Sequence, residues 1–142
     1  MKLILFILFC MWIWSYVSFR RKHSVNMIAL DVMKARRPEG IDPTYECRLG
    51  SAYMEAQQYA DAYRCFQSYL SKYGNLPGST ADAVRANIEF CKHPVPGCNG
   101  PKNLNGSWWH NFLLVRLGGR RCNMMTQEDG LAINAFLRMK NR

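Results

Sequence analysis

Four residues in the C-terminal half are the strongest candidates for chemistry in this chain. Cysteine thiolates and histidine nitrogens are the ligands that zinc prefers, and a Cys-x-His pair followed by two more cysteines can supply up to four of them. The candidates are Cys91, His93, Cys98 and Cys122. Their spacing matches no common zinc module, so we expect no metal and no other cofactor, and interpret them as free thiols beside an incidental histidine.

A loop disulfide is the second interpretation of the same cysteines. Cys91 and Cys98 flank the rigid run Pro94-Val95-Pro96-Gly97. They could close a loop there if the domain faced an oxidising compartment. The cytoplasmic location predicted below argues against this pairing.

Catalytic arrangements are not evident. None of His23, His93 and His110 has a nearby Ser or Cys together with a carboxylate in a known triad arrangement. The run Gly118-Gly119-Arg120-Arg121 lacks the lysine and hydroxyl of a phosphate-binding loop. The formal charge of +9 is spread over the whole length with no recognition motif, so nucleic-acid binding is not expected either. We predict that the protein is not an enzyme.

Residues 3–19 form an uncharged apolar run, LILFILFCMWIWSYVSF. Its length is close to the lower limit for crossing a bilayer core of roughly 30 Å. Aromatic side chains are concentrated in its second half, and Arg20, Arg21 and Lys22 follow directly. Such aromatic rings typically lie among the lipid headgroups at the membrane surface. The pattern predicts a single-pass anchor over residues 1–20. A cleaved signal peptide is the alternative, but no small-x-small site follows the run. Because the basic residues lie mostly after the run, the positive-inside tendency predicts a cytoplasmic C-terminal domain.

Residues 21–41 are predicted to form a basic juxtamembrane helix and a linker. Ser24 can cap a helix that ends before the break at Pro38-Glu39-Gly40. The apolar residues of this helix are Met27, Ile28, Leu30 and Met33. It could lie on the membrane or pack as the helix before the next element, and packing is the preferred interpretation.

Residues 43–76 have the periodicity of two amphipathic helices joined by a short polar break at Gln57 and Gln58. A break of this length brings successive helices back antiparallel. The small residues Gly50 and Ala62 fall where two helix backbones would cross, and bulky Tyr53 and Phe66 would fill the space beside them. The sequence therefore predicts a packed helical hairpin.

This hairpin resembles one tetratricopeptide repeat over its full length. The residues that carry the resemblance are Leu49, Gly50, Tyr53, Tyr59, Ala62 and Phe66. The chain departs from the usual pattern where Tyr69 replaces a small residue and Gly74 replaces the terminal proline. The resemblance implies an all-α domain over residues 42–142, a short antiparallel, right-handed stack.

Three further helices are expected after the hairpin. One runs from Ser79 through about Cys91, one covers residues 107–117, and the last follows Thr126, whose spacing to Asp129 is that of a capping pair. The fold class predicted is thus all-α, with an N-terminal transmembrane helix followed by a tetratricopeptide-like stack.

The resemblance also implies a function, because such repeats act as protein-binding scaffolds whose first helices line a concave groove. The matching positions here are Thr44, Cys47, Ser51 and Met54. They lack the basic and asparagine residues with which some family members hold a peptide's terminal carboxylate. We therefore expect a protein partner of unknown identity. One repeat is short of the three or so that usually stand alone, so a structural subunit of a membrane complex or a homo-oligomer is the alternative. A Cys/His metal- or redox-active accessory protein is a third hypothesis.

Overall fold

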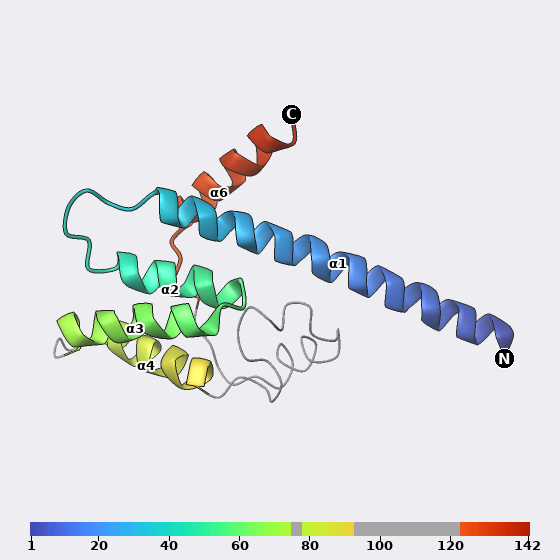
Figure 1. Ribbon diagram of the computed structural model, residues 1–142, viewed down its shortest axis with the longest axis horizontal. Coiled ribbons are helices and arrows are strands. Elements are labelled where there is room, and N and C mark those ends of the chain that lie inside the picture. The colour runs from blue at the N-terminus through green and yellow to red at the C-terminus, as the bar shows by residue number, and fades with distance from the viewer. Residues whose placement is uncertain (75–77, 93–122) are drawn as a thin grey trace.

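The structure is a computed structural model, and it describes residues 1–74, 78–92 and 123–142. This part of the chain is all-helical and contains no strand (Figure 1). The helices are α1 (Lys2–Ala35), α2 (Tyr45–Glu55), α3 (Tyr59–Tyr73), α4 (Ser79–Lys92) and α6 (Gln127–Lys140). A long apolar helix at the N-terminus is followed by a helical stack, as the sequence predicts. The predicted helix over 107–117 lies outside the described residues.

α1 is one continuous helix of 34 residues. It is long and apolar enough to cross a membrane by length and composition. The side chains of its first half are exposed, with Phe9, Trp12 and Tyr16 stacked along one face. The expected helix start at Ser24 is wrong, because Ser24 lies inside α1 and the backbone hydrogen bonds run through it.

α2 and α3 form the predicted antiparallel hairpin. The connection turns at Gln57, whose φ of 62° is left-handed, and Gln58 precedes the first residue of α3. Gly50 lies against the buried ring of Phe66, and a Cβ atom built on Gly50 would come within 2.8 Å of that ring. A small residue facing a large one therefore brings the two helices close, as the sequence indicates.

α4 packs on α3 and completes the main core. This core gathers the buried side chains of the hairpin with those of α4, which are Cys47, Met54, Tyr59, Ala62, Phe66, Tyr69, Val84, Ile88, Phe90 and Cys91. The rings of Tyr59 and Phe90 meet edge to face at 5.7 Å between centroids. The described hairpin thus continues into a third helix, and the order in the stack follows the order in the chain.

The last turns of α1 belong to the stack. Leu30 and Met33 are buried with Ala52 and Ala56 of α2, and the Asn26 amide donates to the carbonyl of Glu55 at 3.0 Å. The structural unit therefore begins within α1, before the expected domain start at residue 42. The reason is that the apolar face of residues 27–33 meets the small residues of α2 directly.

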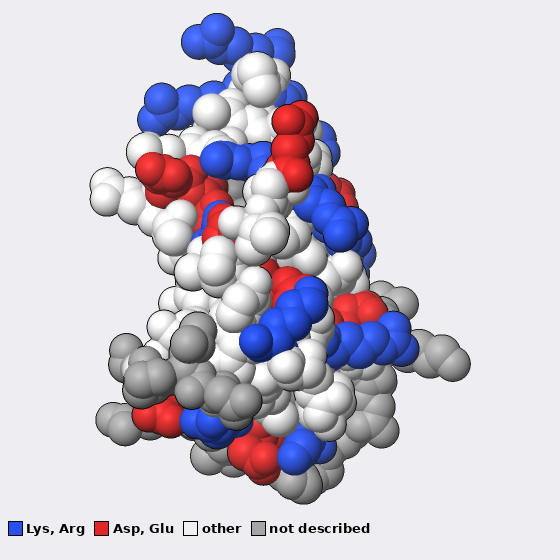
Figure 2. All heavy atoms as spheres, turned by 90° about the vertical axis from the view of Figure 1, so that its left-hand side faces the viewer, with Lys and Arg blue, Asp and Glu red and all other residues white. Residues whose placement is uncertain are grey.

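α6 packs across the same part of α1. Ile133 is buried against Ala29 and Val32. Thr126 and Asp129 form the predicted capping box, with each side chain accepting the other's backbone N–H. The C-terminal end of α6 points away from the stack (Figure 1), and charges of both signs are interspersed over the stack on the face shown in Figure 2.

Candidate functional site

The predicted groove residues on α2 are mostly buried. Cys47 is 1% exposed and both Ser51 and Met54 are 0% exposed, whereas Thr44, just before the first residue of α2, is exposed. The expectation that all four line an open groove is therefore corrected. Of the four, only Thr44 is exposed in this conformation.

The chain's own segment explains this burial. Residues 123–126, which we call the covering segment, have no regular secondary structure and precede α6, and Thr126 has an extended backbone. The backbone N–H of Met124 donates to Ser51 Oγ at 2.9 Å, and the Met124 side chain packs on the core cluster that contains Cys47 and Met54. The Ser51 hydroxyl, which could accept a hydrogen bond from a partner's backbone, thus already accepts one from the chain's own backbone.

An open pocket remains beside the covering segment. It has a volume of about 430 Å³. The residues that line it include Thr44 just before α2, Cys47 of α2, Thr80 and Ala83 of α4, and Met124. Small polar and apolar side chains, one thioether and Arg48 form its walls. Because the Arg48 guanidinium is paired with two carboxylates, the pocket suits an uncharged side chain or a narrow segment of a protein.

Arg48, at the border of this pocket, links three parts of the chain. Its guanidinium donates to Asp129 Oδ1 of α6 and to Asp42 Oδ2 in the loop before α2, both at 2.6 Å. The side chains of Arg48 and Asp129 are 16% and 1% exposed. Hydrogen bonds from Thr44 and the charge of Arg48 hold the pKa of Asp42 below its usual value. The Asp42 carboxylate is thus charged where it pairs with the guanidinium, and through its bond to Asp129 Arg48 holds the covering segment and α6 against α2.

Sequence reasoning missed this network. Asp129 has the spacing of a helix cap, and that role is correct, since Oδ2 accepts the N–H of Thr126. The other carboxylate oxygen, Oδ1 of Asp129, accepts a hydrogen bond from Arg48, which lies 81 positions earlier. Local spacing contains no signal for a contact at that distance.

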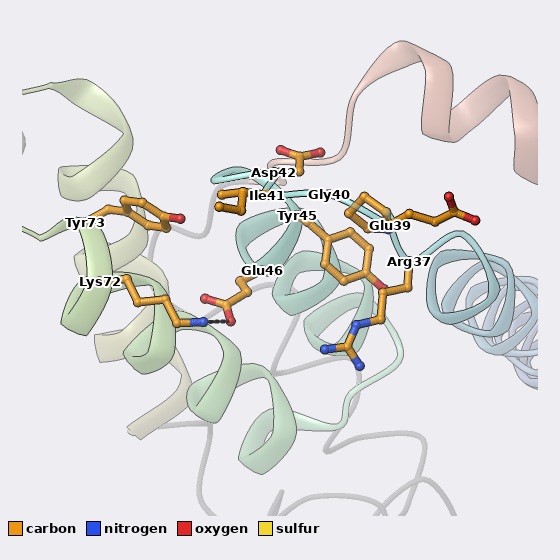
Figure 3. A pocket seen from close by; sticks show the side chains of 10 residues that line it. Arg37, Glu39, Gly40, Ile41, Asp42, Tyr45, Glu46, Lys72 and Tyr73 are labelled. Atoms are coloured by element: carbon orange, nitrogen blue, oxygen red, sulfur yellow. Dashed lines mark hydrogen bonds and ion pairs between the residues drawn. The ribbon is translucent and has the colours of Figure 1, made fainter.

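A second pocket, of about 520 Å³, lies between the loop after α1 and the helices α2 and α3 (Figure 3). Lys72 and Glu46 pair across it at 2.8 Å, and this hydrogen bond raises the pKa of Lys72. The Tyr45 hydroxyl, which also lines it, donates to the carbonyl of Met33 at 3.0 Å. Because Lys72 stays charged and paired, it is not suited to act as a base, and the pocket is a polar surface cleft.

The cysteine and histidine candidates are only partly described. Cys91 is a buried free thiol at the end of α4, and burial raises its pKa to about 12. A thiol with so high a pKa is a poor metal ligand and nucleophile at neutral pH. His93, Cys98 and Cys122 lie outside the described residues. Within residues 1–74, 78–92 and 123–142, no three side chains of His, Cys, Asp or Glu are grouped as metal ligands would be.

Comparisons with protein-family models, with curated proteins and with solved structures each found no match. The resemblance to a tetratricopeptide repeat therefore rests on the residues of the hairpin and is not established by a relative.

Proposed function

We propose that this protein is a single-pass membrane protein whose helical stack is a non-catalytic scaffold for a protein partner. One observation carries the proposal. α1 exposes apolar side chains along its first half, while Leu30 and Met33 near its end are buried in the core of the stack. A single uninterrupted helix thus joins a surface that suits lipid to a packed domain that suits proteins.

The orientation follows from charge. Arg20, Arg21 and Lys22 come directly after the apolar run, and Lys34, Arg36 and Arg37 follow within the next turns and loop. Positively charged flanks favour the cytoplasmic side. The proposal therefore places the stack in the cytoplasm.

The pocket beside the covering segment is the proposed partner site. Helical repeat domains bind partner segments along their first helices, and α2 and α4 are the first helices of the hairpin and of the unit that follows it. Thr44, just before α2, and Thr80 and Ala83 of α4 are small pocket residues that are not buried. Their small size favours a partner segment that inserts one apolar or uncharged side chain.

The test uses the full-length protein in its native membranes, with a C-terminal tag and a cross-linker. An arginine at Ala83 fills the pocket wall with a long charged side chain, so Ala83→Arg is expected to abolish capture of a specific cytoplasmic partner. Ala60→Arg is the matched control, because Ala60 is an exposed residue of α3 that does not line the pocket. Equal capture by the two variants would contradict the pocket as the partner site.

The anchor and its orientation are tested separately. Retention in the membrane fraction after alkaline carbonate, with the tag accessible only from the cytoplasmic side, is the expected result. Release by carbonate would contradict the anchor, and a tag protected on the other side would contradict the orientation. Capture of the protein by itself alone would favour a homo-oligomer.

A further inference from the structure

α6 exposes an apolar face that no described element covers. Ile133 is buried on α1, whereas Leu131, Phe136 and Met139 are 62%, 43% and 67% exposed. Leu131, Ala135 and Met139 follow at intervals of four, which places them on one side of the helix. Phe136 and Met139 lie in the last turns, where the helix points away from the stack (Figure 1).

The same end of α6 is strongly basic. After Asp129 the chain contains no acidic residue, and Arg138, Lys140 and Arg142 are exposed. In the described part of the chain none of these three forms an ion pair. Figure 2 shows basic side chains at the top of the molecule, where α6 ends, with uncharged side chains directly below them. An apolar face beside several cations is typical of a helix that binds an anionic lipid surface.

The packing of α6 directs this end toward the proposed membrane. Arg36 Nη1 donates to the carbonyl of Glu128 at the start of α6, and Ile133 packs on Ala29 and Val32. α6 therefore starts beside the end of α1 and turns back toward the side of the apolar run, inclined away from α1 (Figure 1).

The distances fit contact with headgroups. Ala29 lies about 15 Å beyond Phe19, at about 1.5 Å per residue. The turns of α6 after Ile133 are about 10 Å long. Because α6 is inclined to α1, only part of this length is directed back toward the bilayer (Figure 1), and that part is subtracted from the distance of about 15 Å. The basic end is thus placed on the order of 10 Å from the hydrocarbon edge, within about one Debye length of anionic headgroups.

We propose that the end of α6 is a second membrane contact, in which Phe136 and Met139 enter the headgroup layer and the three cations bind anionic lipid. This inference rests on the proposed function, because it requires α1 to lie in the same bilayer. Arg20, Arg21 and Lys22 at the end of the apolar run bind the same layer, so the stack is held at two places and its orientation to the bilayer is fixed.

The experiment measures amide hydrogen exchange of the full-length protein in nanodiscs. One set contains phosphatidylcholine alone, and the other contains equal parts of phosphatidylcholine and phosphatidylserine. The amides at the end of α6 are expected to exchange at least about tenfold more slowly on the anionic discs, since each cation near such a surface contributes a factor of about five. The amides of α3 are expected to exchange equally in both.

A matched pair of variants separates specific contact from net charge. One variant removes the cations of α6, and it is expected to lose the lipid dependence: Arg138→Gln, Lys140→Gln and Arg142→Gln. The other removes three exposed cations of α3 and α4, and it is expected to keep the dependence: Arg64→Gln, Arg85→Gln and Lys92→Gln.

The outcomes distinguish the two proposals. Stable incorporation into both kinds of disc with no lipid effect on α6 would overturn the second contact and leave the anchor intact. Protection of α6 that depends on protein concentration instead of lipid would also overturn it, in favour of a second copy covering this face. Failure of the chain to enter either disc would overturn the anchor itself.

Discussion

Arg48→Ala is expected to release α6 from the stack. The substitution leaves the Asp129 carboxylate, which is 1% exposed, without its cationic partner. Breaking a buried ion pair by removing one partner costs about 3–5 kcal/mol. Arg48 and Asp42 are partly exposed, at 16% and 32%, and Asp129 keeps its hydrogen bond from Thr126. We therefore expect a loss of about 2–3 kcal/mol, at or just below the lower limit of that range.

The assay is thermal unfolding of the full-length protein in nanodiscs, with pulse labelling of thiols as the readout. Cys47 is buried, and Met124 of the covering segment packs on the same core cluster. We therefore expect Cys47 to become reactive when that segment leaves. A loss of 2–3 kcal/mol corresponds to a midpoint lowered by roughly 10 °C at about 4 °C per kcal/mol. Asp129→Asn preserves an oxygen for Thr126 and leaves Arg48 paired with Asp42, so it is expected to cost less, about 1–2 kcal/mol.

The double variant Arg48→Met with Asp129→Asn, compared with the single changes Arg48→Met and Asp129→Asn, tests the coupling. Replacing a whole buried pair by groups of similar volume is often nearly neutral, so this variant is expected to be more stable than the sum of the two single changes predicts. Strict additivity, or an Arg48→Ala midpoint equal to that of the wild type, would refute the reasoning that Arg48 holds α6 in place.

Three further predictions concern the stack. Gly50→Ala places a methyl group within 2.8 Å of the buried ring of Phe66, so urea unfolding is expected to show a net loss of about 1 kcal/mol after the gain in helix propensity is included. Burial raises the pKa of the Cys47 and Cys91 thiols from 9.0 to about 12, and the unfolded chain therefore ionises first. Their contribution to stability is complete below pH 9 and is lost between pH 9 and about 12, which a series of melting curves would show, and Cys91→Ala should reduce the slope. Deleting all of α1 is expected to unfold or aggregate the remaining stack, whereas a chain beginning at Lys22 should stay monomeric and folded by size-exclusion chromatography, because only the first deletion uncovers the core.

The hairpin could be predicted because its determinants are local. Gly50, Ala62 and Phe66 recur at helical spacing within one short segment, and the polar break at Gln57 and Gln58 has the length of a helix connection. The cap at Thr126 is equally local, since its partner is three residues away. Such features form through contacts between residues close in the sequence, so the residue types and their spacing are nearly enough to predict them.

The closed groove could not be predicted, because its cause is distant in the sequence. The hydrogen bond of Met124 to Ser51 joins positions 73 residues apart, and neither residue belongs to a motif. The resemblance to a repeat predicts that this face of α2 lines a groove, but the burial of Cys47 and Met54 depends on what the rest of the chain places there. The prediction of a separate helix capped by Ser24 failed for a similar reason. The helix that contains residues 3–19 continues through Ser24, so Ser24 does not cap a new helix.

The continuity of α1 has a consequence for partner choice. A hinge at Ser24 would have let the stack swing freely, whereas one helix fixes its distance from the apolar run. If α1 spans the membrane as proposed, the core residue Leu30 lies only about 16 Å beyond Phe19, at about 1.5 Å per residue. The pocket between α2 and α4 is then held near the bilayer. The partners best placed to reach it are themselves membrane proteins or are bound at the membrane surface, because a partner at the surface encounters the pocket in the orientation that α1 and α6 together impose.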